Sequence, residues 1–266
     1  MKRRLLLIGI DGLRVDRAFG TGLAPTLDAL AARGSIRHAT VEGPTISGPS
    51  WSSILTGATC EEHGVIDNTF AAKNLREGGD FLSRAAADDP ATRTYAISTW
   101  EGIARSEGPG PILATRPEQI AAGLHRNIVI DYRNHVGDPD DEVCDQAVTA
   151  LMDGVIDVGF VYLGTVDGAG HTHGGLSEEY DEAVRAADMR VARLLGALQR
   201  RVDDAGEQWI VAITTDHGHT DAGGHGGDSD LERRTFLLVD GVGTTAVQVP
   251  DGIRPVQFTE LLLAAR

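Results

Sequence analysis

Short apolar runs that stop abruptly at a polar residue are the feature that most constrains the fold of this chain. Residues 5–10 are followed by Asp11, and residues 209–213 are followed by two threonines and Asp216. Continuous apolar runs of this length are typical of strands buried on both faces of a parallel sheet. Because helices cover both faces of such a sheet, the pattern predicts an α/β protein with a mostly parallel central sheet.

Strand and helix patterns alternate along the rest of the chain. We expect further strands at residues 35–41, 94–98, 127–131, 158–163 and 235–239. We expect helices at residues 25–33, 50–55, 80–87, 138–152, 178–200 and 259–265. A chain of 266 residues is long enough for one large core, and we predict a single domain over residues 1–266. The less regular stretch within about residues 70–145 is predicted to be a small cap or insertion.

The charge balance and the cysteines limit the partners and the setting. The chain has 24 basic and 39 acidic residues, a net charge of -15, which disfavours nucleic acid polymers and anionic membranes. The apolar run at residues 5–10 is too short for a signal peptide, and no segment approaches membrane-spanning length. Cys60 and Cys144 lack metal-ligand spacing, so a reduced cytoplasmic location is the simpler expectation, with a disulfide as the alternative. These features leave the oligomeric state undefined.

Three predicted strands each deliver a carboxylate to the same edge of the sheet. These carboxylates belong to Asp11, Asp167 and Asp216. Three histidines accompany them, His171, His217 and His225. We expect the glycines of segment 164–174 to let the backbone fold so that Asp167 and His171 can reach one point. Because converging carboxylates repel each other unless cations lie between them, the pattern predicts a site for two divalent ions, zinc with manganese as the alternative.

A hydroxyl-rich segment at residues 44–68 supplies candidate nucleophiles. Ser47 precedes a Gly-Pro pair, and a helix starting near Ser50 would point its N-terminal amides at an anion. A hydroxyl at a helix N-terminus is more often a cap than a nucleophile, and several serines and threonines compete for the role. The residues alone therefore leave the nucleophile open.

Five segments carry a resemblance to a known family. They read IGIDG, TISGPSWSSILTGATCEEHGVIDN, VDGAGHTHG, TTDHGHT and GGHGG. In order and spacing they resemble the alkaline phosphatase superfamily, and within it the type I phosphodiesterase/nucleotide pyrophosphatase branch. The segments extend from Asp11 to His225, nearly the whole chain. The resemblance implies an alkaline-phosphatase-like three-layer α/β/α sandwich and a metal-dependent hydrolase.

The resemblance also implies roles for individual residues. One ion would be held by Asp167, His171 and His225. The second would be held by Asp11, Asp216 and His217. Ser47 matches the family's threonine or serine nucleophile, which implies in-line attack and a covalent phosphoryl-Ser47 intermediate. His63 matches a position that we take to be structural.

We predict three substrate-binding positions. Two of them differ from the family's usual residues, and the third has an alternative structural role. Gly48 and Ser50 stand where we expect a base-stacking aromatic and a phosphate-binding asparagine, so we predict a weakened hold on the base and on the phosphate. Tyr162 matches a second base-stacking aromatic, and packing in the core is the alternative.

Other polar and aromatic residues near the motifs have two readings each. His173 and His219 could support the ligands from behind, but a place on the loop surface is favoured. Trp51 either lines the pocket or packs at the start of its helix. A tryptophan at this position does not fit the arginine that a sulfatase requires there.

We expect a hydrolase that cleaves phosphodiester or pyrophosphate bonds of a small substrate, with a nucleotide as one candidate. The partner would be a small-molecule phosphate ester. A phosphomonoesterase or phosphonate hydrolase on the same scaffold is the alternative, and a non-catalytic metal-binding homologue is a third. An intact Ser47 with all six ligand positions argues against the third.

Overall fold

A seven-stranded sheet runs through the middle of the protein, with strand order β2-β7-β6-β1-β5-β3-β4. We analysed a computed structural model, which describes residues 2–71, 73–75, 79–104, 110–131 and 135–266. The strands are β1 (Arg4–Ile10), β2 (Ser35–Thr40), β3 (Thr94–Ser98), β4 (His125–Val129), β5 (Val158–Leu163), β6 (Trp209–Thr214) and β7 (Arg234–Val242). All neighbours pair in parallel except β7, which is antiparallel to both β2 and β6. The predicted mostly parallel sheet is therefore confirmed.

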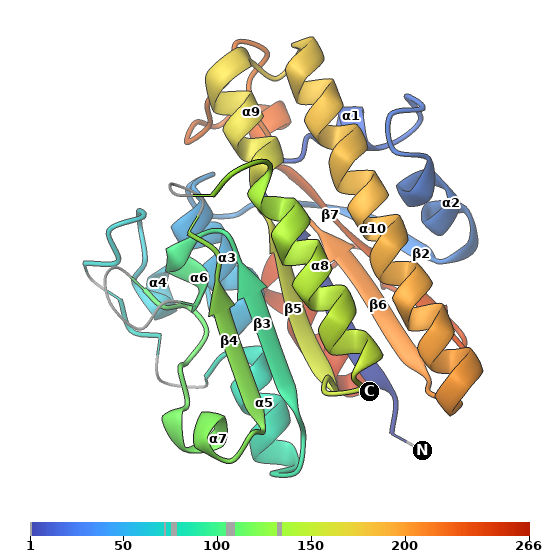
Figure 1. Ribbon diagram of the computed structural model, residues 1–266. Coiled ribbons are helices and arrows are strands. Elements are labelled where there is room, and N and C mark those ends of the chain that lie inside the picture. The colour runs from blue at the N-terminus through green and yellow to red at the C-terminus, as the bar shows by residue number, and fades with distance from the viewer. Residues whose placement is uncertain (1, 72, 76–78, 105–109, 132–134) are drawn as a thin grey trace.

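Helices cover both faces of this sheet. They are α1 (Val15–Ala18), α2 (Pro25–Arg33), α3 (Ser47–Thr56), α4 (Cys60–His63), α5 (Phe81–Asp88), α6 (Glu101–Ala104), α7 (Pro117–Ala121), α8 (Pro139–Met152), α9 (Thr165–His173), α10 (Glu178–Ala205), α11 (Asp230–Arg233) and α12 (Phe258–Ala265). A short 3₁₀ turn, η2 (Pro255–Gln257), precedes α12. Figure 1 shows α8 and α10 side by side across one face, with α2 beyond them. Helices α3, α5 and α12 pack against the opposite face.

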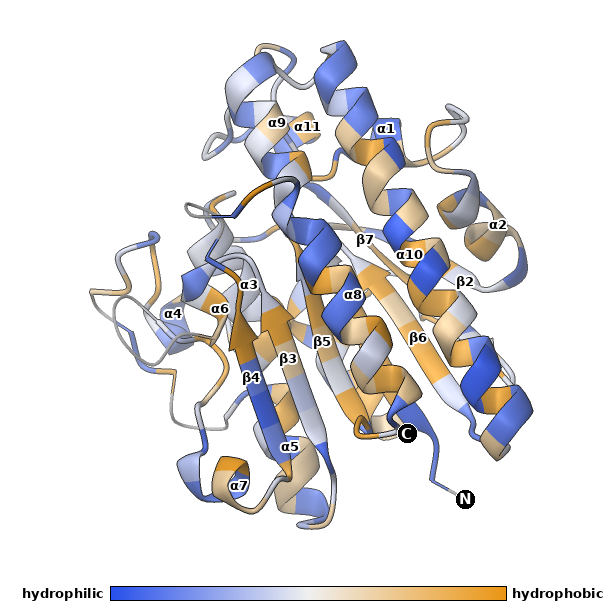
Figure 2. Cartoon of the chain, viewed as in Figure 1, coloured by the Kyte–Doolittle hydropathy of each residue, from blue (hydrophilic) through white to orange (hydrophobic). Residues whose placement is uncertain are grey.

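The core divides into two layers because successive side chains of a strand point to opposite faces. From β1, Leu6 and Ile8 join the layer under α8 and α10, whereas Leu5 and Leu7 join the layer under α3 and α12. Figure 2 shows β5 and β6 as largely apolar and α10 as a helix that carries both apolar and hydrophilic residues. The alternation gives the central strands β1, β5 and β6 two buried faces and produces the predicted three-layer sandwich.

Helix α9 lies within the glycine-rich segment 164–174, where we expect the glycines to let Asp167 and His171 reach one point. The buried Asp140 carboxylate on α8 accepts hydrogen bonds from the Gly164 and Thr165 backbone N–H groups at 3.0 and 2.9 Å. This anchor satisfies donors that the start of a helix leaves unpaired, which offsets the cost of the glycines. In a helix, positions four apart share a face, so the spacing brings Asp167 and His171 together by helical periodicity.

The middle of the chain contributes to the sheet itself. Strands β3 and β4 form its outer edge beyond β5, and helices α5, α6 and α7 lie around them. Residues 72, 76–78, 105–109 and 132–134, where part of the predicted cap falls, lie outside the described residues. Cys60 and Cys144 are both free. Among the helices described, none has the length and apolar character needed to cross a membrane.

Candidate metal centre

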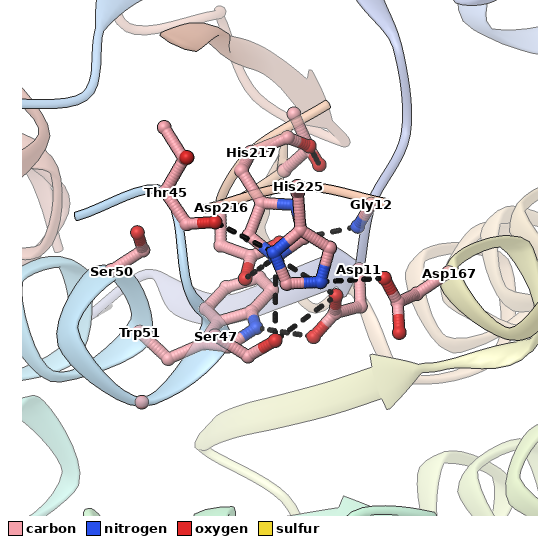
Figure 3. Close-up of polar contacts among 12 residues, drawn as sticks. Asp11, Gly12, Thr45, Ser47, Ser50, Trp51, Asp167, Asp216, His217 and His225 are labelled. Atoms are coloured by element: carbon pink, nitrogen blue, oxygen red, sulfur yellow. Dashed lines mark hydrogen bonds and ion pairs between the residues drawn. The ribbon is translucent and has the colours of Figure 1, made fainter. Parts of the chain in front are cut away.

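The candidate site lies at the carboxyl ends of three adjacent strands. Asp11 directly follows β1, and Asp216 and His217 follow its neighbour β6. On the other side of β1, strand β5 leads into α9, which carries Asp167 and His171. Side chains that end neighbouring parallel strands project into one crevice, so residues up to 206 positions apart in the sequence meet here (Figure 3).

Asp11, Asp216 and His217 form the buried trio, since all three are 0 % exposed. The Nε2 atom of His217 lies 3.2 Å from Asp216 Oδ2 and 3.6 Å from Asp11 Oδ1. The Nδ1–H group of His217 can donate to the Gly218 carbonyl at 3.1 Å, which leaves a lone pair on Nε2. The trio therefore directs an imidazole nitrogen and two carboxylates at one point.

Asp167, His171 and His225 form the open trio, with side-chain exposures of 20 %, 49 % and 8 %. Asp167 Oδ1 lies 3.5 Å from the Nε2 atoms of both histidines, which are 2.9 Å apart. The Nδ1–H group of His225 can donate to the Thr45 carbonyl at 2.6 Å, so its Nε2 also presents a lone pair. Ligand atoms on a zinc tetrahedron are about 3.3 Å apart, which these distances approach.

The carboxyls of the site cannot all ionise at ordinary pKa values. Burial, with repulsion from Asp167 next in importance, raises the pKa of Asp11 to about 8. Burial and the charges of Asp11 and Asp167 raise the pKa of Asp216 well above its ordinary value. Burial opposes ionisation of Asp167 as well, but the hydrogen bond from His219 and the nearby imidazoles hold its pKa below the ordinary value. Burial lowers the pKa of His217 to about 3, so this imidazole is neutral and able to bind a cation.

The donor set fits divalent cations. Asp216 Oδ1 accepts from the Gly12 N–H at 3.2 Å, but no hydrogen bond among the described residues reaches its buried Oδ2. A buried carboxylate oxygen without a donor is costly unless a cation lies beside it. Each trio offers ligand atoms within 4.8 Å of one another, as does a third group formed by Asp167, His217 and His219. Neutral imidazoles and carboxylates are the ligand types that zinc and manganese accept.

Ser47 is the first residue of α3, and its hydroxyl faces the buried trio. Its Oγ atom lies 3.3 Å from His217 Nε2 and 3.5 Å from Asp11 Oδ1 (Figure 3). The start of a ten-residue helix carries partial positive charge, which favours an anion at this position. The structure thus brings Ser47 and all six predicted ligand residues to one place.

Two aromatic side chains donate hydrogen bonds to the Asp11 carboxylate. Trp51 Nε1 and the Tyr162 hydroxyl donate to Asp11 Oδ2 at 2.8 and 2.6 Å. Trp51 is 0 % exposed and Tyr162 4 % exposed, so both pack inside the protein. Trp100 stands over the Tyr162 ring, with ring centroids 6.3 Å apart. This arrangement matches the packing alternative for Tyr162, and stacking on a substrate base stays a prediction.

The region beside Ser47 holds a residue that sequence reasoning missed. The Asn68 Oδ1 atom accepts from the Gly48 N–H at 2.7 Å, and Asn68 is otherwise exposed. Asn68 thus places a carboxamide beside Gly48, although Ser50 stands at the family's asparagine position. Ser50 points its hydroxyl at the Pro44 carbonyl, 3.2 Å away. Asn68 belongs to the HGVIDN segment of the family resemblance. Its contact with Gly48 could not be predicted from local sequence because the two residues are 20 positions apart.

His219 also differs from its prediction. It is 0 % exposed, not on the loop surface, and its Nε2 lies 2.9 Å from Asp167 Oδ1. His173, the other histidine with two readings, is an exposed residue of α9. His63 is buried, with its Nε2 3.0 Å from the Ser53 hydroxyl and its Nδ1 accepting from the Val65 N–H at 3.0 Å.

Several known proteins are similar to this chain in sequence or in structure. Human ectonucleotide pyrophosphatase/phosphodiesterase family member 7 is 25 % identical over 246 residues, covering 85 % of this chain and 50 % of that protein. The solved structure of human ectonucleotide pyrophosphatase/phosphodiesterase 5 has a TM-score of 0.71 at 14 % identity and covers 99 % of this chain and 94 % of that one. Phosphonoacetate hydrolase from Sinorhizobium meliloti has a TM-score of 0.65 at 13 % identity, with coverages of 99 % and 96 %.

The structural and the sequence similarities support different conclusions. The two solved structures confirm the alkaline-phosphatase-like fold, and at such low identity they show the fold alone. The chain spans about half the length of the curated relatives it matches first. The family model described as type I phosphodiesterase/nucleotide pyrophosphatase matches residues 5–232. This chain therefore belongs to the type I phosphodiesterase/nucleotide pyrophosphatase family.

Proposed function

We propose that this protein is a metal-dependent hydrolase of phosphodiester or pyrophosphate bonds in small substrates, with Ser47 as its nucleophile. The observation that carries the proposal is the position of the Ser47 hydroxyl, 3.3 and 3.5 Å from His217 and Asp11 of the buried trio. A hydroxyl that only caps a helix would contact the backbone N–H groups of that helix, whereas the Ser47 hydroxyl contacts the Asp11 and His217 side chains.

The two trios would each hold one divalent ion, zinc or manganese. Such ions neutralise phosphate charge and favour ionisation of a nearby hydroxyl near neutral pH. The chain's own residues do the positioning. The start of α3 supplies positive potential at Ser47, while Trp51 and Tyr162 orient the Asp11 carboxylate through its other oxygen.

The proposed reaction has two steps. In the first, Ser47 Oγ forms a bond to phosphorus as the bond to the leaving oxygen breaks, and its proton leaves to solvent or to the departing group. In the second, water attacks the phosphoryl-Ser47 ester, which releases the phosphate monoester and restores the hydroxyl. Asn68 supports both steps in the proposal: its Oδ1 is held by Gly48, which leaves its amide N–H groups as donors for a phosphate oxygen.

The nature of the substrate follows from charge and access. The net charge of -15 works against a polyanionic substrate, and the two ions would supply the local positive charge that a small phosphate ester needs. Tyr162 is covered by Trp51 and Trp100, so the proposal does not depend on stacking of a nucleobase at Tyr162.

The decisive experiment compares bis-p-nitrophenyl phosphate with p-nitrophenyl phosphate as substrates for the zinc- and the manganese-loaded protein. We expect faster hydrolysis of the diester. Ser47→Ala should abolish turnover without loss of bound metal, because Ser47 is not one of the six ligand residues. Ser52→Ala is the matched control, since Ser52 lies on the same helix and its buried hydroxyl has no hydrogen bond among the described residues. Preference for the monoester, or full activity of Ser47→Ala, would overturn the proposal.

A further inference from the structure

His219 is a buried histidine for which the reaction described above has no use. It is 0 % exposed, and its ring lies next to three other rings of the site, those of His171, His217 and His225. Its nearest polar contact is the Asp167 carboxylate, at 2.9 Å from Nε2 to Oδ1. A carboxylate can only accept, so the Nε2–H group of His219 must be the donor.

The His219 ring lies in a slot between two glycines, Gly12 and Gly170, which have no side chains to fill the space. A Cβ atom on Gly12 would lie 2.8 Å from His219 Nε2, and one on Gly170 would lie 2.7 Å from Nε2 and Cε1. Gly12 is in the loop after β1 and Gly170 is on α9, so two separate elements make room for one imidazole. The three atoms nearest a Cβ on Gly170 all belong to this ring, so a side chain there would push the ring away from Asp167, whereas a Cβ on Gly12 would also lie 2.8 Å from the Asp167 Cα atom.

Packing alone does not account for a histidine in this slot. With Nε2–H donating to Asp167, the other ring nitrogen, Nδ1, is a buried acceptor that has no hydrogen bond among the described residues. Leaving such a group unpaired costs about 1–3 kcal/mol, and an apolar side chain would avoid that cost. The hydrogen bond to Asp167 is the interaction that an apolar side chain cannot replace.

We propose that His219 is a positioning residue for the ion of the open trio, acting through Asp167. This inference rests on the proposed function, because it assumes that the open trio holds an ion. His219 fixes the Asp167 carboxylate so that Oδ1 stays 3.5 Å from the Nε2 atoms of His171 and His225. It lies two residues after His217, so it also ties the open trio to the loop that carries part of the buried trio.

The test measures ion binding to the metal-free protein by competition with a chromophoric zinc chelator, without any substrate. His219→Leu removes the donor, and we expect affinity for one of two zinc ions to fall about ten- to a hundredfold. His219→Gln keeps an N–H donor at the same reach, and we expect it to restore most of that loss. Equal affinity of wild type and His219→Leu would overturn the inference. So would a Gln variant as weak as the Leu variant, because that result would make His219 a direct ligand.

Glycine variants on α9 test the slot independently. Gly170→Ala should weaken the binding of the same zinc ion. Gly168→Ala should leave zinc binding unchanged, because a Cβ on Gly168 meets nothing within 4 Å. In a His219→Ala background the space is free, so Gly170→Ala should add less than about a twofold loss. An equal Gly170→Ala loss in both backgrounds would overturn the slot argument.

The outcomes separate this inference from the proposed function. If wild type binds two zinc ions but does not cleave phosphate diesters, the proposed function fails while the His219 comparison still stands. If diesters are cleaved and His219→Leu binds zinc like wild type, only the His219 inference fails. A wild-type protein that binds no zinc or manganese overturns both.

Discussion

The buried trio and the open trio contain the same residue types but are built differently. Asp11, Asp216 and His217 are fully buried and come directly after adjacent strands, whose spacing the sheet ladder sets. Asp167, His171 and His225 are partly exposed and come from a short helix and a glycine-rich loop. The position of α9 depends on the Asp140 anchor, and that of Asp167 on His219.

This difference separates two ways of making a metal site. The buried trio is closed to solvent, and its carboxylates are costly to ionise in the metal-free protein. The open trio is partly exposed to solvent. We therefore expect the buried ion to be held tightly and exchanged slowly, and the open ion to be weaker and to leave first when a chelator is added.

Asp216→Asn should have the largest effect. The amide keeps the shape of the side chain but removes the charge next to the buried Oδ2 position. We expect kcat/KM for the diester to fall at least about a thousandfold, since a bound ion supplies several kcal/mol of charge stabilisation. Excess zinc should not restore the rate. Steady-state kinetics with metal analysis checks this prediction. An activity within tenfold of wild type would contradict the expectation that the buried trio matters more than the open trio.

His171→Ala should have a smaller and recoverable effect. His171 is 49 % exposed, so water can take its place at an ion. We expect about a hundredfold weaker binding of one zinc ion, and most of the activity should return as the zinc concentration rises. Zinc titration of the rate measures both. His173→Ala is the control, because this neighbour on α9 belongs to neither trio. A loss that zinc cannot reverse would mean that the open trio tolerates the loss of a ligand no better than the buried trio.

Tyr162→Phe tests the support of the buried trio. The variant keeps the ring but removes the hydroxyl that donates to Asp11 Oδ2 at 2.6 Å. Because a hydrogen bond to a charged group contributes about 1.5–3 kcal/mol, we expect at least about tenfold weaker affinity for the buried ion. Zinc competition experiments measure this change. Unchanged metal affinity would mean that this hydrogen bond does not support the buried trio.

The metal-free protein should lose stability as pH rises from about 6.5 to 8. The Asp11 pKa is raised from 3.8 to about 8, so in this range the folded state binds a proton that the unfolded state has released. Asp216 acts in the same direction. The lowered pKa values of His217 and His225 act only below about pH 6.5, where unfolded histidine becomes protonated.

Urea unfolding at several pH values measures this slope. We expect the free energy of unfolding to fall by about 1–2 kcal/mol over this pH range. Asp11→Asn should make this fall smaller, and bound zinc should abolish it. A metal-free protein whose stability stays level or rises between these pH values would show that the buried carboxyls are not destabilised.

Much of the fold could be predicted from local pattern. Residues 5–10 and 209–213 are apolar throughout, and such runs have few stable alternatives to a central strand. Asp11 and Asp216 stand where those strands end, so their convergence follows from the geometry of a parallel sheet. The same spacing carries the family resemblance, which the match over residues 5–232 confirms.

The surroundings of the ligands depend on contacts between distant segments, which local pattern does not contain. His219 and the exposed His173 are both histidines in glycine-rich stretches, yet only His219 has Gly12 and Gly170 packed against its ring. Asn68 meets Gly48, and Asp140 anchors α9, across separations of 20 or more residues. Burial, hydrogen-bond partners and pKa depend on which segments pack together, and so these properties appear only once the whole chain has folded.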